Sequence, residues 1–117
     1  MIHGDGTAVR SYLYAADLAQ WLLVLLVRGV PGRAYNVGSN QPVTITGLAQ
    51  IAASLALPPV PVKVLGGPSG QGSAPVYLPV IDRAVGELGL AVRTPLPEAL
   101  ARTLAWYRSR PEPAPRW

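Results

Sequence analysis

Apolar residues recur at helical spacing in four stretches of this 117-residue chain, separated by segments rich in glycine and proline. The four stretches predict helices over about 16–28, 47–56, 82–88 and 96–108. Gly29 and Gly89 follow the first and third stretches, and glycine is common just beyond a helix end. Thr44 or Thr46 would cap the second helix with its hydroxyl group. The pattern therefore predicts a largely helical unit.

The first predicted helix carries apolar residues around more of its circumference than one packing face needs. Its stripe consists of Leu18, Trp21, Leu22, Leu25 and Leu26, widened by Ala19, Leu23, Val24 and Val27. A helix with so wide an apolar arc packs on more than one side. A chain of 117 residues has little material to cover it twice, so we expect that a covering element is missing.

Three short segments between the helices are predicted to be extended. Residues 11–14 form one, and residues 34–38 read as a short, largely buried strand. Residues 61–65 begin with a proline, which confines a strand there to a sheet edge or a strand start. Residues 66–75 hold four glycines and two prolines and are predicted to be a loop.

The composition excludes most self-contained catalytic sites. Half of the residues are apolar and only 14% are charged, which argues against intrinsic disorder. The chain has no cysteine, which excludes disulfides, thiolate zinc sites, iron–sulfur clusters and cysteine nucleophiles. The single histidine, His3, cannot form a histidine metal cluster and makes an internal Ser-His-Asp triad a poor hypothesis. We therefore expect no catalytic residues and no metal site within these residues.

The charge and hydropathy patterns indicate neither nucleic acid nor a membrane as a partner. The net charge is +4, but most arginines are scattered singly, and the nearest approach to a cluster is Arg102, Arg108, Arg110 and Arg116. A nucleic-acid binder usually gathers such charges on one face. The apolar run at 18–27 is shorter than the roughly 20 residues that span a bilayer, and Gln20 interrupts it.

A series of short motifs runs through about residues 3–108. In order they are Gly4-Asp5-Gly6, Val9-Arg10-Ser11-Tyr12-Leu13-Tyr14, Ala16-Asp17-Leu18-Ala19, Ala34-Tyr35-Asn36-Val37-Gly38-Ser39, Val43-Thr44-Ile45, Arg83-Ala84, Glu87-Leu88-Gly89-Leu90 and a final helix ending in Trp106-Tyr107. In this order and spacing they resemble the C-terminal portion of the NAD-dependent nucleotide-sugar epimerases and dehydratases, which are extended short-chain dehydrogenases. Within that family the similarity is to the dTDP-glucose 4,6-dehydratase-like group.

This resemblance implies an α/β fold, namely the C-terminal part of a Rossmann-like extended short-chain dehydrogenase with a few short strands and about four helices. Residues 1–40 would be the last strand-helix-strand elements of the dinucleotide-binding domain, and 41–95 the small nucleotide-sugar-binding subdomain. Residues 96–110 would form the C-terminal helix, followed by a flexible tail at 111–117. The complete enzyme would be a cytoplasmic homodimer that uses NAD in cell-surface polysaccharide synthesis.

Two motifs of the resembling family do not occur in this sequence. They are the Gly-rich pyrophosphate loop and the catalytic Tyr-x-x-x-Lys pair, since the only lysine, Lys63, has Pro59 four residues before it. NAD is therefore expected in the complete enzyme and not on this chain alone. The complete enzyme would dehydrate or epimerise a nucleotide sugar, and these residues by themselves should be catalytically inactive.

Three residues are candidates for binding the nucleotide-sugar substrate. The resemblance implies that Arg10 contacts the diphosphate, for which a planar guanidinium is well suited. Tyr77 would pack on the nucleotide base, and Asn36 would line the cleft. The alternatives are an ordinary exposed arginine, rim or core packing for Tyr77, and a structural hydrogen bond from Asn36 to neighbouring loop backbone.

The sequence also departs from the family near the predicted loop. Many members have a second phosphate-binding arginine there, but residues 69–76 contain none. Ser69, Gln71 and Ser73 would then supply weaker neutral contacts, or the diphosphate affinity is reduced. Asp17, in the first turn of the first helix, is interpreted as a helix-start carboxylate and not as a catalytic one.

Two functions of other classes remain open. The first is a non-catalytic interaction module that docks through the apolar helix at 16–28. The second, weaker alternative is peripheral membrane association through that helix and the basic C-terminal tail.

Overall fold

The computed structural model describes residues 1–67 and 74–110, and the four predicted helices are present in it. In chain order the elements are β1 (Val9–Arg10), α1 (Ala15–Arg28), β2 (Val43–Thr44), α2 (Ile45–Ser54), α3 (Asp82–Leu88) and α4 (Leu96–Arg108). The bounds of α3 and α4 are those predicted, α1 begins one residue earlier, and α2 lies two residues earlier at both ends. The predicted tail at 111–117 and the candidate contacts Ser69, Gln71 and Ser73 lie outside the described residues.

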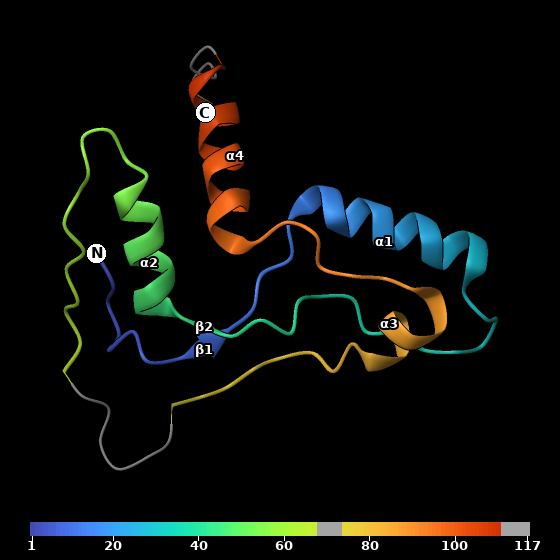
Figure 1. The fold of residues 1–117 in the computed structure, drawn as a ribbon. Helices are drawn as coiled ribbons and strands as arrows, with labels where there is room; N and C mark the ends of the chain where they lie inside the picture. The colour runs from blue at the N-terminus through green and yellow to red at the C-terminus, as the bar shows by residue number, and fades with distance from the viewer. Residues whose placement is uncertain (68–73, 111–117) are drawn as a thin grey trace, which may run out of the picture.

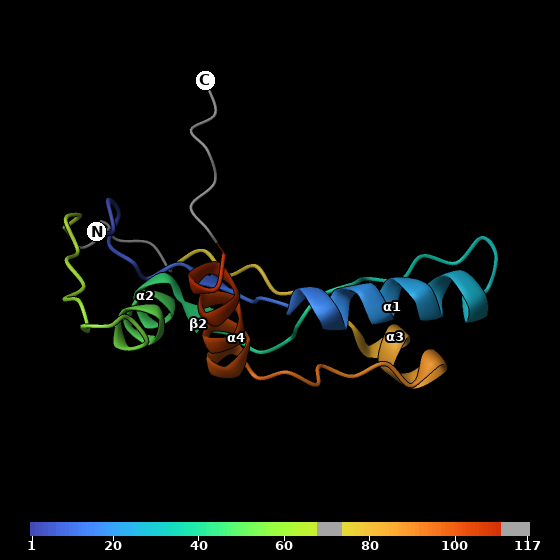
Figure 2. The same ribbon diagram turned by 90° about the horizontal axis from the view of Figure 1, so that it is seen from above.

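The helices are arranged in two groups at opposite ends of the molecule (Figure 1). Helices α1 and α3 lie side by side at one end, while α2 and α4 lie at the other, beside the antiparallel pair β1–β2. Residues 29–42, 74–81 and 89–95 run between the two groups, as the view from above also shows (Figure 2). The connecting segments therefore decide how the two ends are held together.

Thr44 and Thr46 have different roles at the start of α2. Thr44 is the N-cap, and its hydroxyl accepts a hydrogen bond of 2.9 Å from the Gly47 amide. The Thr46 amide and hydroxyl both donate to the Gly6 carbonyl, at 3.0 and 3.1 Å. Gly6 has a φ of 73°, a left-handed backbone conformation that favours glycine at this turn. Together these bonds fix α2 to the segment that leads into β1.

The predicted extended segments differ most from the structure. Residues 11–14 and 34–38 are not strands among the described residues, and 61–65 contributes only an isolated parallel bridge between Ile2 and Val64. A strand exists only when a second segment completes its hydrogen-bonded ladder. For residues 34–38 the described part of the chain supplies no such partner. An apolar pattern can identify a segment that is suited to a sheet, but it does not show whether a partner strand is present.

The core lies between α1 and α3. Its buried apolar residues are Trp21, Ile81, Ala84, Leu88 and Leu90, and it is lined by the half-buried Leu13, Val24, Leu25, Tyr35, Val37 and Val92. Trp21 is 1% exposed, and its indole Nε1 donates a hydrogen bond of 3.1 Å to the Ala91 carbonyl. The single tryptophan of α1 therefore anchors both the core and the segment that follows α3.

Asp17 is a buried carboxylate that ties α1 to the segment before α4. Its Oδ2 accepts hydrogen bonds of 2.9 Å from the Arg93 and Thr94 amides, and its Oδ1 accepts one of 3.1 Å from the Thr94 hydroxyl. Burial alone would raise the pKa of Asp17, but these hydrogen bonds and the charge of Arg93 outweigh it and lower the pKa. Asp17 is therefore a structural residue, and its contacts reach far beyond the first turn of α1.

The outer side of α1 is an exposed apolar surface. Leu26 is 82% exposed, and the other members of this surface are Leu18, Leu22, Leu23 and Val27. The wide apolar arc predicted for this helix is thus uncovered in the structure. Among the described residues, no helix is long and apolar enough to cross a membrane.

The Asp17 contacts predict a measurable loss of stability. In Asp17→Ala, three donors near α1 lose their acceptor, and the free energy of unfolding should fall by about 2–3 kcal/mol. Denaturant unfolding followed by circular dichroism would measure this loss. Asp82→Ala, in the exposed first turn of α3, is the matched control and should cost less than about 1 kcal/mol.

The lowered pKa of Asp17 also predicts a pH dependence. A carboxylate with a lowered folded-state pKa stabilises the fold above its unfolded-state pKa of about 3.9, and this stabilisation is lost as the pH falls through the folded-state value. Asp17→Asn has no carboxylate at this site, so its stability should fall less than that of the wild type on acidification from about pH 5. Parallel acid profiles of the two proteins would contradict this role.

The exposed side of α1 should bind an apolar fluorescent dye or drive self-association of the isolated chain. Leu26→Glu should remove much of either effect, because it places a charge in the middle of this surface. The control is Leu57→Glu, since Leu57 is 81% exposed but lies outside α1. A monodisperse monomer with weak dye binding would mean that the fold covers this helix by itself.

Candidate functional site

Arg10 lies at the end of β1, where a distant segment joins the strand. The Val9 amide donates a hydrogen bond of 2.9 Å to the Pro75 carbonyl, and the Tyr77 amide donates one of 3.1 Å to the Val9 carbonyl. A parallel bridge between Val9 and Val76 results. Arg10 and Tyr77, two of the three predicted substrate residues, are therefore carried by neighbouring backbone segments although 66 residues separate them in the sequence.

The guanidinium of Arg10 is held in place by backbone carbonyls. Its Nη1 donates hydrogen bonds of 2.7 Å to the Val9 carbonyl and 3.0 Å to the Pro75 carbonyl. An arginine side chain has five N–H donors, and those on Nη2 and Nε make no hydrogen bond to a described residue. The side chain is thus oriented by its own strand while part of its donor capacity remains for an anion.

A cavity of about 270 Å³ lies beside this junction. It is lined by Ser11, Leu13, Leu18, Val37, Gly38, Ser39, Tyr77 and Pro79. Gly38 is needed where its segment approaches residues 77–79, because a Cβ there would lie 2.7 Å from the Pro79 Cγ. Tyr77 is 73% exposed, so its ring stands at the rim of the cavity and is accessible to a ligand.

Asn36 fixes one wall of the cavity. Its side-chain amide donates a hydrogen bond of 2.9 Å to the Val80 carbonyl, which joins the segment of Val37 and Gly38 to the segment of Tyr77 and Pro79. The structure thus contains the structural bond that the sequence allowed as one interpretation of Asn36. Its side chain is exposed and does not line the cavity, whereas the next residue, Val37, does.

The arrangement can bind a ligand, but it offers little for acid–base chemistry. Tyr77 lines the cavity, and Arg10 and Asn36 each immediately precede a lining residue. No acidic or histidine side chain lines the cavity, and the described residues contain no group of acidic, histidine or cysteine side chains that could hold a metal ion. A guanidinium and an exposed aromatic ring on neighbouring segments are chemically suited to an anion that carries a flat heterocycle.

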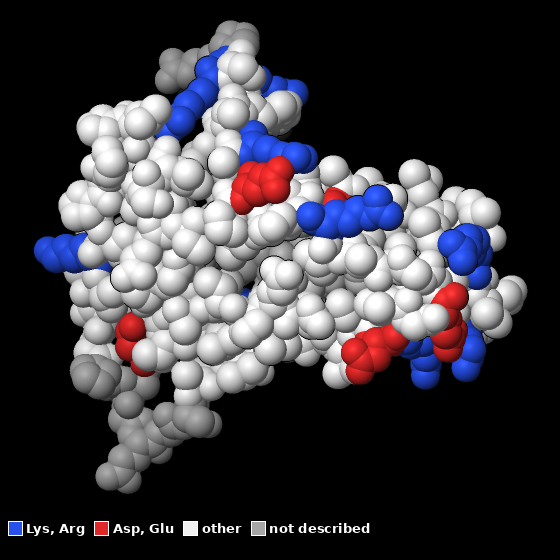
Figure 3. Space-filling view, in the orientation of Figure 1, with Lys and Arg blue, Asp and Glu red and all other residues white. Residues whose placement is uncertain are grey.

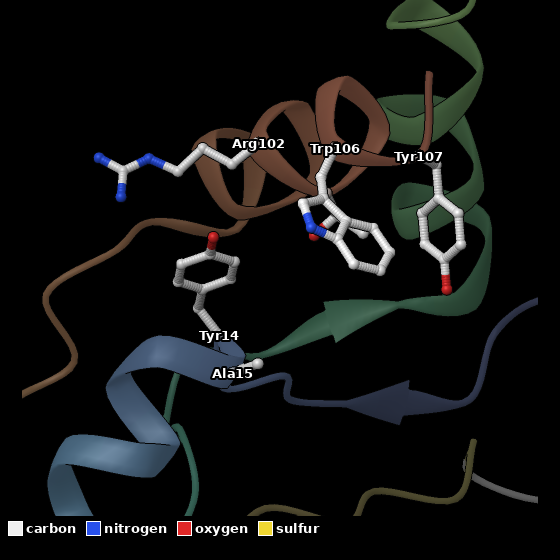
Figure 4. Close-up of a pocket in the computed structure, with 6 residues that line it drawn as sticks. Tyr14, Ala15, Arg102, Trp106 and Tyr107 are labelled. Atoms are coloured by element: carbon white, nitrogen blue, oxygen red, sulfur yellow. The ribbon is translucent and has the colours of Figure 1, made fainter. Parts of the chain in front are cut away.

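A second cavity, which the sequence reasoning missed, lies between α4 and the start of α1 (Figure 4). Its volume is about 310 Å³, and it is lined by Tyr14, Ala15, Arg102, Thr103, Trp106 and Tyr107. Arg102 is paired with Glu98 on its own helix and lies 5.9 Å from the centre of the Tyr14 ring. The three aromatic residues could have pointed to this cavity, but they come together only because α4 lies beside the start of α1.

Comparison with known proteins supports the predicted resemblance. The sequence model of the NAD dependent epimerase/dehydratase family matches residues 1–38. The dTDP-D-glucose 4,6-dehydratase of Mus musculus is 30% identical over 117 residues, which cover 92% of this chain and 31% of the mouse protein. The trifunctional UDP-glucose 4,6-dehydratase/UDP-4-keto-6-deoxy-D-glucose 3,5-epimerase/UDP-4-keto-L-rhamnose-reductase of Arabidopsis thaliana is 33% identical over 113 residues, covering 95% of this chain and 16% of that protein.

The fold is also similar to that of a solved enzyme. The structure of dTDP-glucose 4,6-dehydratase from Bacillus anthracis, in complex with NAD, superposes with a TM-score of 0.80 at 23% identity and covers 95% of this chain and 34% of that one. The predicted resemblance is therefore confirmed, as is the fold class, a part of a Rossmann-like extended short-chain dehydrogenase. The chain spans about a third of the mouse and Bacillus proteins.

Proposed function

We propose that these residues are the nucleotide-sugar-binding, C-terminal segment of an NAD-dependent epimerase/dehydratase. The observation that carries the proposal is the junction at Val9, which sets Arg10 and Tyr77 on neighbouring segments, with the exposed Tyr77 lining a cavity. The reaction of the complete enzyme would be 4,6-dehydration or epimerisation of a nucleotide sugar. We propose a cytoplasmic homodimer that serves cell-surface polysaccharide synthesis.

The chemistry of the two side chains and the names of the relatives support the proposed substrate class. The names of the mouse and Arabidopsis proteins specify dTDP-glucose and UDP-glucose, which are both sugars linked to a nucleoside diphosphate. In this chain Arg10 would donate paired hydrogen bonds to the diphosphate, and Tyr77 would stack on the base. Asn36 would act by fixing the wall between residues 37–39 and 77–80, through its bond to Val80.

The described residues do not fit NAD. A pyrophosphate is usually held where a Gly-rich loop leads directly into a helix. In the described part of the chain the helices follow Tyr14, Thr44, Ile81 and Pro95, and none of them is entered through such a loop. NAD would therefore belong to the complete enzyme, bound by residues outside this chain.

The exposed side of α1 favours a second candidate function, a non-catalytic module that docks through this helix. Leu22, Leu23 and Leu26 are each more than half exposed there, which a soluble chain seldom leaves uncovered at such length. The two candidate functions differ in the binding partner that each requires. The first requires binding of a nucleoside diphosphate, and the second requires only a protein partner.

If this chain binds the substrate while other parts of the enzyme carry the catalytic residues, the isolated chain should have no turnover. Mixed with NAD and a panel of dTDP- and UDP-sugars, it should produce no 4-keto sugar and no epimer, because it has no Tyr-x-x-x-Lys pair to transfer the proton. Chromatography of the sugar nucleotides would measure this. Turnover above a buffer control would overturn the assignment of catalysis to other parts of the enzyme.

Arg10→Ala should weaken nucleotide-sugar binding in a complete enzyme that contains this segment. A charge-assisted hydrogen bond contributes about 1.5–3 kcal/mol, which corresponds to about a 10- to 150-fold loss of affinity. Arg10→Lys should restore only part of the lost affinity, since an ammonium group cannot form the paired hydrogen bonds of a guanidinium. Calorimetric titration with a nucleoside diphosphate measures both variants, and NAD affinity should remain unchanged.

The matched control is Arg33→Ala, because Arg33 is paired with Glu87 near α3 and does not line the cavity. The Arg33→Ala variant should bind the nucleoside diphosphate with the affinity of the wild type. Equal affinities for wild type, Arg10→Ala and Arg10→Lys would show that Arg10 is an ordinary surface residue.

A further inference from the structure

Arg28 and Arg93 differ from the other arginines that the structure describes, because their side chains have no partner there. Each of the others donates a hydrogen bond, forms an ion pair or lies over an aromatic ring; these are Arg10, Arg33, Arg83, Arg102, Arg108 and Arg110. The guanidiniums of Arg28 and Arg93 make no hydrogen bond, ion pair or ring contact with a described residue. Their N–H donors are therefore available to a ligand.

These two arginines line the same cavity, which lies between the second half of α1 and the segment that follows α3. Its volume is about 210 Å³, and its polar side chains are those of Gln20, Arg28 and Arg93. Arg28 belongs to the last turn of α1, whereas Arg93 lies between α3 and α4, so the fold brings together residues that are far apart in the sequence. The cavity shares no lining residue with the one beside Tyr77.

The side chains of this cavity supply donors and positive charge without a compensating acid. Among the described residues, no acidic side chain lines it. Ala91, which also lines it, has a carbonyl that accepts the Trp21 indole N–H at 3.1 Å, while its amide makes no hydrogen bond to a described residue. Oxygens of an anion accept hydrogen bonds from such donors, and the positive charge strengthens these bonds.

Acidic residues elsewhere on the molecule are paired with other cations. On the face shown in Figure 3, acidic side chains beside α3 and along α4 lie next to basic ones. These pairs join Glu87 to Arg33 and Arg83, and Glu98 to Arg102. The positive charge at the cavity is consequently not neutralised by an ion pair within the described part of the chain.

Two local interactions use the charges of Arg28 and Arg93 but leave their donors free. Arg28 is in the last turn of α1, where a positive charge is favourable at the negative end of the helix dipole. The charge of Arg93 interacts favourably with that of Asp17, but the Asp17 oxygens are bonded by the Arg93 and Thr94 amides and the Thr94 hydroxyl. Neither interaction requires the two guanidiniums to line one cavity.

We propose that this cavity binds a phosphate group, either as inorganic phosphate or as part of a small phosphomonoester, between Arg28 and Arg93. Guanidiniums on two sides can share the oxygens of one phosphate, each through paired hydrogen bonds, and two positive charges match its dianionic form. The volume of about 210 Å³ leaves room for a group that consists of a phosphorus atom and its oxygens. The site goes beyond the proposed function, which places the substrate beside Arg10 and Tyr77.

A bound phosphate would connect α1 to the segment that leads into α4. Arg28 is the last residue of α1, and Arg93 lies shortly before Leu96, the first residue of α4. The phosphate would add a further connection near the bonds of Asp17 and Trp21 to the same segment. Since a ligand that binds only the folded state stabilises it, phosphate should raise the melting midpoint.

The test titrates the 117-residue chain with sodium phosphate and, separately, with glycerol phosphate at constant ionic strength. Nuclear magnetic resonance follows the Ala91 amide and the Trp21 indole N–H, and both signals should shift with saturation. Sodium chloride and sodium acetate at the same ionic strength should cause no saturable shift and no rise in the melting midpoint. The tighter of the two phosphates identifies the source of the ligand.

Arg28→Ala and Arg93→Ala should each weaken phosphate binding about 10-fold or more, because each removes charge-assisted hydrogen bonds. The matched control is Lys63→Ala, which removes one positive charge from an exposed position outside the cavity and should bind phosphate as the wild type does. Arg10→Ala should also leave phosphate binding at this cavity unchanged. Failure of the substrate proposal would therefore be distinguishable from failure of this one.

Shifts that do not saturate, or that are equal with chloride, would overturn the proposal and leave Arg28 and Arg93 as solvated surface residues. Alanine variants that bind phosphate as tightly as Lys63→Ala would overturn it too. If an alanine variant does not fold, Arg28→Gln or Arg93→Gln takes its place, since glutamine keeps a long polar side chain but lacks the charge. The glutamine variants should show the same loss of affinity, and wild-type affinity in them would contradict the site.

Discussion

The buried carboxylate of Asp17 is the interaction that joins the two ends of this molecule. Asp17 and Trp21 lie one turn apart on the inner side of α1, and both bind the segment between α3 and α4, at residues 91–94. Burying a carboxylate is unfavourable unless it is fully hydrogen-bonded. Here two amides and a hydroxyl meet that condition, so the start of α4 is held by α1 instead of by a large apolar contact.

Periodicity predicted the helices because the backbone hydrogen bonds of a helix all lie within its own segment and its apolar face recurs at a fixed spacing. The bounds of α3 were predictable from Gly89, whose φ of 67° ends the helix. Gly29 instead has an extended conformation, and glycine is required there because a Cβ would lie 2.4 Å from the Leu25 carbonyl oxygen. The strand predicted at 34–38 is not present among the described residues, because a strand needs a second segment to complete its hydrogen-bonded ladder.

The candidate site was predictable only in part, because it too depends on contacts between residues that are far apart in the sequence. The resemblance singled out Arg10 and Tyr77, yet no local pattern indicates that Val9 binds Pro75 and Tyr77 across more than 60 residues. Asp17 was interpreted as a helix-start carboxylate, and its partners at residues 93–94 could not be read from the first turn alone. The aromatic cavity at Tyr14 and Trp106 was missed because it depends on the placement of α4 beside the start of α1.

The placement of Arg10 connects substrate binding to the rest of the proposed enzyme. Only residues 11–14 separate Arg10 from the first residue of α1, and Leu13 of that short link packs against the core. In the proposed function, the core around Trp21 would therefore help to set the position of the Arg10 side chain. Positioning of this kind matters to an enzyme, because small displacements of bound groups cost rate steeply.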